Sequence, residues 1–250
     1  MKKTAILLLA LVMVCAGAAV VMAKVAGTPH DLHTGNAAEI CAFCHTPHGG
    51  STTQAPLWNR SQATQTYTYY TSATFDMTPV ATGQPGIGSA GCLVCHNGVA
   101  STLVNYPGPG STTNTDYGFT MTSGVTSAEN FALLGTDLSN DHPISFTYAP
   151  SLDQDNNGFP TAGSNGWIPG QVSTGAGGNY KLYGSSKNQF ECATCHAVHN
   201  TNTNATYVSH LGTWDQANRS YSSLPAANEV YFLRTSNTGS KMCMDCHVNR

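Results

Sequence analysis

The most hydrophobic part of the chain is its beginning, where the apolar run Ala5–Met22 follows two lysines and leads into Ala23. A basic head, an apolar stretch and then small residues are typical of a secretory signal peptide. We therefore predict a cleaved signal peptide at residues 1–23. The alternative is an uncleaved membrane anchor, because the run is about long enough to span a bilayer. Cys15 would also fit a lipoprotein signal, but Val14 before it is branched where a small residue is expected.

Beyond residue 23 the hydrophobic pattern is weak. Leu, Ile and Phe are sparse, and residues 101–185 are rich in Gly, Ser, Thr, Asn and Pro, with little helical or strand periodicity. We predict mostly coil, with short helices around four cysteine motifs and a few small strands near Tyr67–Tyr70. An irregular segment of this length normally argues against a compact domain. We therefore expect a group other than side chains to fill the centre of the molecule.

Composition and charge exclude several classes of protein. Of 250 residues only 9% are charged, against about 25% in an average soluble domain. Such a composition does not support a coiled coil or an amphipathic helical bundle. Ten Lys and Arg against 13 Asp and Glu give a net charge of −3, so the chain lacks the basic field that nucleic-acid binding requires. No apolar stretch after the signal could cross a membrane. We expect an exported protein, extracellular or on the cell surface, or alternatively periplasmic.

The cysteines carry the strongest functional signal. There are nine, and every one except Cys15 belongs to a C-x-x-C-H motif. The motifs begin at residues 41, 92, 192 and 243, and their members are Cys41, Cys44 and His45; Cys92, Cys95 and His96; Cys192, Cys195 and His196; and Cys243, Cys246 and His247. C-x-x-C-H is the attachment site of a c-type haem. Two thiols on one helical turn can each add to a haem vinyl group, which brings the following imidazole beneath the iron as its proximal ligand.

Three other interpretations of the cysteines are weaker. Exported cysteines often form disulfides, and four C-x-x-C pairs could build two Cys₄ zinc sites, but neither requires a histidine after every pair. A thioredoxin-like redox motif needs a βαβ setting, which the sequence does not indicate. Because histidine is 10 of 250 residues, four successive chance occurrences have a probability on the order of 10⁻⁶. We predict four covalently bound haems, numbered one to four along the chain, in an electron carrier without catalytic residues.

The motif spacing indicates an internal repeat. The gaps between first cysteines are 51, 100 and 51 residues, which predicts two dihaem modules, at 24–100 and 186–250. Residues 101–185 form a connecting segment. Both leading motifs continue as C-H-x-x-H, and Trp58 with Asn59-Arg60-Ser61 has an echo in Trp214 with Asn218-Arg219-Ser220. Four apolar macrocycles would then replace the side-chain core that the composition lacks.

The remaining histidines are candidates for the distal iron ligands. They are His30, His33, His48, His142, His199 and His210. Six candidates for four irons make bis-histidine coordination possible throughout. Methionine is the alternative ligand and would raise the reduction potential.

Position along the chain narrows the choice of distal ligand. His48 and His199 each follow a proximal histidine by three residues, too few to reach the far side of the same iron, so each must serve a neighbouring haem. His142 best suits haem two, and His33 or His30 best suits haem one. His210 competes with His199 for haem four.

At this point the chain resembles a known family, the extracellular filament-forming tetrahaem cytochromes of metal-reducing bacteria. The matching features are a His-rich N-terminal segment, the run Glu39-Ile40-Cys41-Ala42-Phe43-Cys44-His45-Thr46-Pro47-His48, a His-Pro loop at 142–143, a third motif extended to His199, and a last motif close to Arg250. The extra upstream histidine, His30 beside His33, departs from the family pattern and leaves the ligand of haem one open.

The resemblance implies a multihaem cytochrome fold and an assembly of identical subunits. In that family protomers stack head to tail, and the second histidine of the first C-H-x-x-H ligates an iron of the next subunit. Carried over, that residue is His48 and its acceptor is haem three, through His196. The resulting hypothesis is electron transfer along a conductive filament to extracellular acceptors or redox partner proteins. The alternatives are a monomeric periplasmic electron shuttle and a multihaem reductase, which would need an iron with an open coordination position.

Overall fold

A computed structural model describes about half of the chain. The described residues are 25, 30, 40–51, 54, 56–61, 64–79, 83–99, 133–154, 158–170, 179–199, 214–215, 220–221, 232–235 and 237–249. The predicted signal peptide and the candidate ligands His33 and His210 lie outside these residues.

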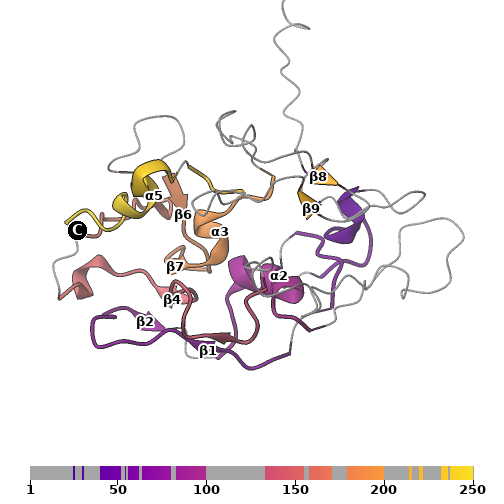
Figure 1. The fold of residues 1–250 in the computed structure, drawn as a ribbon, viewed down its shortest axis with the longest axis horizontal. Helices are drawn as coiled ribbons and strands as arrows, with labels where there is room; N and C mark the ends of the chain where they lie inside the picture. The colour runs from indigo at the N-terminus through magenta and orange to yellow at the C-terminus, as the bar shows by residue number, and fades with distance from the viewer. Residues whose placement is uncertain are drawn as a thin grey trace, which may run out of the picture.

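Regular structure in the described residues is short and scattered (Figure 1). The helices are η1 (Ile40–Phe43), α2 (Ile87–His96), η3 (Pro150–Leu152), α3 (Cys192–Cys195), η4 (Thr238–Ser240) and α5 (Lys241–Met244). The strands are β1 (Thr68–Tyr69), β2 (Thr78–Pro79), β3 (Asp137–Leu138), β4 (Phe146–Thr147), β5 (Trp167–Pro169), β6 (Asn179–Lys181), β7 (Gln189–Phe190), β8 (Trp214–Asp215) and β9 (Ser220–Tyr221). Within the described part of the chain, no helix is long and apolar enough to cross a membrane.

The strands form four small sheets. Strands β2, β4 and β7 make an antiparallel sheet in that order, with β4 in the middle. Antiparallel pairs also join β5 to β6 and β8 to β9, whereas β1 pairs with β3 in parallel. Helices α2 and α3 pack together, and α3 also contacts β6. Figure 1 shows α2 and α3 near the middle of the ribbon and α5 close to the C-terminus.

The longest helix, α2, is positioned by one buried face. Its residues Ser89, Leu93 and Val94 are almost fully buried, a spacing that places them on one side of the helix. Leu93 packs against Tyr67 and Leu138 from the β1 and β3 region. Asn97, which ends the helix, donates from Nδ2 to the Tyr67 hydroxyl at 2.9 Å. These contacts fix the second cysteine motif, since Cys92, Cys95 and His96 all lie on this helix.

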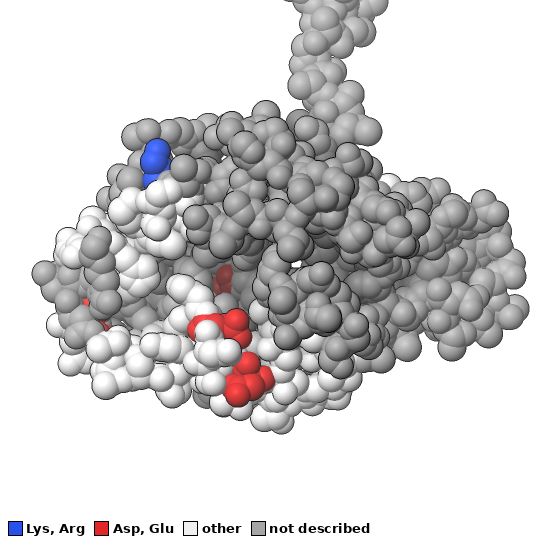
Figure 2. Space-filling view, viewed as in Figure 1, with Lys and Arg blue, Asp and Glu red and all other residues white. Residues whose placement is uncertain are grey.

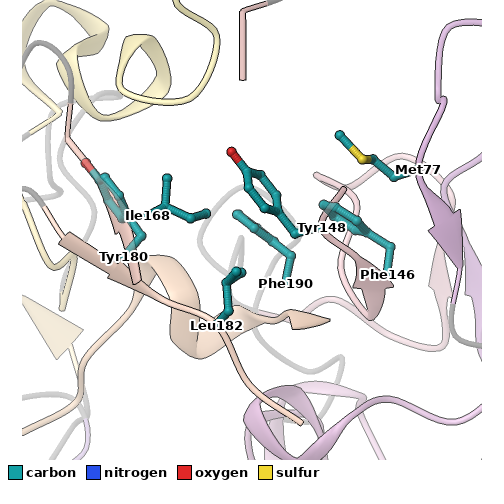
Figure 3. Packing of buried hydrophobic residues seen from close by; sticks show 7 residues of the cluster. All are labelled: Met77, Phe146, Tyr148, Ile168, Tyr180, Leu182 and Phe190. Carbon is teal, nitrogen blue, oxygen red and sulfur yellow. The ribbon is translucent and has the colours of Figure 1, made fainter. Parts of the chain in front are cut away.

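A hydrophobic cluster forms beside the third and fourth motifs (Figure 3). Its buried members are Met77, Phe146, Tyr148, Ile168, Tyr180, Leu182 and Phe190. The motif cysteines Cys195 and Cys246 pack against it. Five members lie between residues 146 and 182, in the connecting segment where the sequence showed little strand periodicity. That segment therefore supplies most of this cluster in addition to linking the two modules.

Phe190 tests the importance of this cluster. Its ring stacks on Phe146 at 5.1 Å between centroids and on His142 at 5.5 Å. Phe190→Ala is expected to lower the free energy of unfolding by about 3–5 kcal/mol, because a buried aromatic ring leaves a cavity. Leu152→Ala is the control, since that side chain is 41% exposed and its loss should cost no more than about 0.5 kcal/mol. Denaturant unfolding measures both, and equal losses would contradict the assignment of Phe190 to the core.

The two leading motifs share a local structure. After motif one, the Thr46 N–H donates to Leu57 and the Asn59 N–H donates to Cys44. After motif three, the equivalent hydrogen bonds are donated by the Ala197 N–H to the Phe232 carbonyl and by the Arg234 N–H to the Cys195 carbonyl. They form the isolated antiparallel bridges His45–Trp58 and His196–Leu233. Leu57 and Phe232 also share a left-handed backbone, with φ of 56° and 60°.

The structural repeat therefore differs from the sequence similarity between the segments around Trp58 and Trp214. Side chains at matching positions cap matching carbonyls: Asn59 donates to Ala42 at 2.8 Å, and Arg234 donates to Ala193 at 2.9 Å. The counterpart of Trp58 is Leu233, and not Trp214 as the echo suggested. Trp58 follows Cys41 by 17 residues whereas Leu233 follows Cys192 by 41, so the equal gaps of 51 residues hide different internal spacings.

Candidate metal centres

Each C-x-x-C-H motif lies on a helical turn. The His45, His196 and His247 N–H groups donate to the carbonyl of the first cysteine of their motifs at 2.8, 3.0 and 2.9 Å, and His96 is the last residue of α2. A turn of this kind brings two cysteines three positions apart to the same side of the helix. All eight motif cysteines are free thiols in the structure. Among the described residues, which include all eight, no three His, Cys, Asp or Glu side chains form a group that could hold a metal ion.

Three of the four motif histidines face a second histidine at nearly constant distance. The ring centroids lie 5.9 Å apart for His45 and His199, 6.1 Å for His30 and His96, and 6.5 Å for His142 and His247. Every pair combines a motif histidine with one of the predicted distal candidates. The two members of each pair come from segments far apart in the sequence.

This separation suits one iron atom between the two rings of each pair. A metal–imidazole bond of about 2 Å and a further ~1 Å to the ring centre on each side give roughly 6 Å between centroids. The interplanar angles of 33°, 70° and 75° are compatible with this arrangement, because each ring can rotate about its bond to the metal. The donor set of two imidazoles beside a pair of thiols fits a c-type haem.

Hydrogen bonds orient two of these rings. His45 donates from Nδ1 to the Pro56 carbonyl at 2.7 Å, and His142 donates from Nδ1 to the Pro143 carbonyl at 2.9 Å. A histidine that binds a metal usually donates its other ring N–H to such an acceptor, which fixes the tautomer and the ring orientation. Nε2 is then the nitrogen left to bind iron in both residues.

The distal candidates favour their neutral, metal-binding form. Burial, together with the neighbouring His96, His196 and His199, lowers the pKa of His30 to about 4. Desolvation also lowers the pKa of His142 and of His199, although both side chains are exposed, and the neighbouring His45 contributes to the shift of His199. Because a protonated imidazole cannot bind a metal, these shifts keep the rings ready for ligation at neutral pH.

Thiols of consecutive motifs are neighbours. The pairs are Cys44 with Cys95, Cys92 with Cys192, and Cys195 with Cys246. Burial and the neighbouring Cys95 raise the pKa of Cys44 to about 11, against an opposing effect of Arg60. A hydrogen bond between Cys92 and Cys192 raises the pKa of the first thiol and lowers that of the second. The four attachment sites therefore follow one another in the order of the sequence.

The pairing of ligands differs from the sequence-based assignment. The sequence assigned His142 to haem two, but its ring lies beside His247 of motif four. His30 lies beside His96 of motif two and not beside His45 of motif one, and His199 is the histidine beside His45. Chain position could not reveal these partners, because the fold brings together segments that are distant in the sequence.

The candidate bridging residue His48 lies in an exposed loop. Its side chain and those of Pro47 and Pro56 are exposed. Thr46 donates from its hydroxyl to the His48 carbonyl at 2.9 Å, which fixes the backbone of this loop. His48 therefore has the accessibility that a contact with a second molecule requires.

Sequence reasoning missed a buried carboxyl group between the second and third motifs. Glu191 is 0% exposed and directly precedes Cys192. The only signal was a weak one, since an acidic residue also lies two positions before Cys41, at Glu39. Nothing in the sequence indicated that Ser89 and Ser145 would converge on this carboxyl group.

Comparison with known proteins adds no family. The chain matches no protein-family model and no curated protein at a significant level.

Proposed function

We propose that the protein binds four c-type haems and transfers electrons along them. The observation that carries this proposal is the set of three histidine pairs about 6 Å apart, each beside a C-x-x-C turn. Haem supplies reversible one-electron chemistry when bound. The motif cysteines hold it covalently, and His45, His96, His196 and His247 bind iron on the proximal side. His199, His30 and His142 bind the irons of haems one, two and four on the distal side.

Two imidazoles at each of three irons favour electron transfer over catalysis. A reductase needs an iron with an open position for its substrate, whereas a bis-histidine iron is closed. Closely spaced attachment sites in sequence order also suit transfer from haem to haem. The protein is accordingly an electron carrier and not an enzyme.

The ligand pairs are tested by removing one distal imidazole. His30→Ala is expected to convert one of four haems from low-spin to high-spin iron, because its sixth ligand is lost, and added imidazole should restore the low-spin state. Phe232→Leu is the matched control, since its ring lies 4.5 Å from that of His30 but cannot bind metal. Electron paramagnetic resonance and visible spectra measure both variants. Four low-spin haems in His30→Ala would contradict the pairing.

The structural repeat supports an assembly of identical subunits. His199 follows motif three and lies beside His45, so a histidine of module two serves a haem of module one. His48 holds the same place after motif one and is exposed. If successive molecules repeat the relation between His199 and the haem of His45, His48 of one protomer binds the iron of haem three in its neighbour. That iron has His196 as its proximal ligand. A head-to-tail contact of this kind that does not close into a ring produces a filament.

The surface composition is compatible with such packing. On the face drawn in Figure 2, the described surface is largely uncharged, with acidic side chains gathered near the lower middle and basic atoms at the upper left. Low charge reduces repulsion between identical molecules.

Electron microscopy of the exported protein separates the filament from its alternative. We expect filaments containing four low-spin haems per protomer. Discrete monomers with the same four haems would contradict the filament and favour a periplasmic electron shuttle. A substantial high-spin fraction in intact protein would favour a reductase.

A further inference from the structure

A buried carboxyl group lies between the second and third haem-attachment turns. Glu191 accepts hydrogen bonds at Oε2 from the Ser89 hydroxyl at 2.5 Å and from the Ser145 hydroxyl at 2.9 Å. Because Glu191 is the N-cap of α3, its side chain also accepts from the Thr194 N–H. Its Oε1 is buried and makes no hydrogen bond within the described part of the chain. A buried carboxyl oxygen without a hydrogen-bond partner is stabilised by binding a proton or by accepting a hydrogen bond.

The fold is built closely around this carboxyl group. A side chain at Gly88 would place its Cβ only 2.8 Å from Glu191 Cβ, and one at Gly86 would collide with Glu191 Oε1. Ser145 has a left-handed backbone with φ of 55°, which a residue other than glycine rarely adopts. Held in this way, the Ser145 hydroxyl accepts from the Gly86 N–H at 3.2 Å while it donates to Glu191. Strained backbone often marks a functional position.

The same network connects the two attachment turns. Ser89 lies on α2 three residues before Cys92, and its hydroxyl oxygen accepts the N–H of Cys192 at 2.8 Å. The side chains of Cys92 and Cys192 are also neighbours. Glu191 is therefore adjacent to the points where haems two and three are attached.

The charged and titratable groups that face Glu191 come from three elements. They are Tyr69 of β1, Tyr183 after β6 and Cys192 of α3. Arg234 lies beyond Tyr183 and donates to its hydroxyl at 3.1 Å. Burial raises the pKa of Glu191, and the hydrogen bonds from Ser89 and Ser145 partly oppose this shift. In the haem-loaded protein Cys192 is a thioether and does not titrate.

We propose that Glu191 is a proton-binding site that couples proton uptake to the reduction of haems two and three. The inference rests on the proposed function, because it requires haem at Cys92 and Cys192. Glu191 takes one proton from solvent to its carboxylate when an electron from the upstream redox donor enters either haem. It releases that proton when the electron passes on.

The direction of the coupling follows from charge. A negative carboxylate stabilises the more positive, oxidised haem, so it lowers the reduction potential. Each added electron in turn makes Glu191 bind its proton more tightly. Above the pH at which oxidised protein loses this proton, the potentials of haems two and three should fall as pH rises. A tenfold difference in proton affinity between the two redox states shifts a one-electron potential by about 59 mV.

Redox titration of the haem-loaded protein at pH values from about 5 to 8 tests the proposal. Glu191→Gln, which is neutral at every pH, is expected to abolish this fall. Its two potentials should stay at the high values that wild-type protein reaches at low pH. Asp137→Asn is the matched control, because that carboxyl group is exposed, and it should keep the wild-type slope. Ser145→Ala should move the fall to higher pH, since the carboxylate loses a donor.

Infrared difference spectroscopy gives a second readout, and its first part needs only the wild-type protein. A carboxylic acid C=O band should grow when wild-type protein is reduced. The absence of this band in Glu191→Gln would assign it to Glu191. A wild-type protein with pH-independent potentials, or a Glu191→Gln protein with an unchanged slope, would overturn the proposal. Haem content is measured first by mass spectrometry. Absence of haem would overturn the proposed function as well, which distinguishes that failure from a haem-loaded protein without proton coupling.

Discussion

His48→Ala is expected to abolish filaments and to leave one high-spin haem per protomer. His48 is too close to His45 to reach the far side of the same iron, and its loop is exposed. An iron–imidazole bond between subunits would fix their register, whereas a low-charge contact surface alone can slip. Removing the imidazole should therefore cause both defects together. Added imidazole should restore low-spin iron without restoring polymer.

His199→Ala is the matched control for this prediction. It removes the corresponding histidine of motif three, whose ring lies 5.9 Å from that of His45 in the same chain. One haem should again become high-spin, but filaments should persist because the junction is untouched. Electron microscopy and electron paramagnetic resonance measure both variants. Unaltered filaments with four low-spin haems in His48→Ala protein would rule out the bridging role.

Loss of haem attachment is expected to have the largest effect on stability. Replacing both thiols of motif three, Cys192 and Cys195, by serine should leave the exported protein without a cooperative unfolding transition and sensitive to protease. Cys195 packs against the hydrophobic cluster around Ile168 and Phe190, so the haem it anchors would complete that cluster. The apolar side chains alone are too few for an ordinary core.

Cys15→Ser provides the control for cysteine replacement. Cys15 lies in the predicted signal peptide, so the variant should keep its haems, its stability and its protease resistance. Near-ultraviolet circular dichroism and limited proteolysis measure the outcome. A cooperatively folded motif-three variant without its haem would contradict the idea that haem forms the centre of the molecule.

The sequence is most informative where a predicted site depends on fixed local spacing. The four C-x-x-C-H motifs could be found because thiols three positions apart are a property of one helical turn. The histidine pairs could not be predicted, since His142 meets His247 only after the chain has folded. Likewise, the true counterpart of Trp58 was hidden because module two places it 24 residues further from its leading motif than module one does.

The hydrophobic cluster left a faint signal in the sequence. Two of its segments alternate with a period of two, as Phe146-Thr147-Tyr148 and Tyr180-Lys181-Leu182, with the apolar members buried. Alternation of this kind predicts strands, but runs of three residues are too short to stand out in a Gly- and Ser-rich background. The buried network around Glu191 left a still weaker signal, because Ser89 and Glu191 are 102 residues apart and meet only through tertiary packing.

The mass of the exported protein tests the central claim most directly. Intact-mass spectrometry should give the chain without residues 1–23 plus four haems, each retained under denaturing conditions because it is covalently bound. Peptide mapping should place one haem on each C-x-x-C-H motif. A mass equal to the bare chain, with its eight cysteines paired as disulfides, would contradict the prediction of four haems. So would haem on three motifs or fewer.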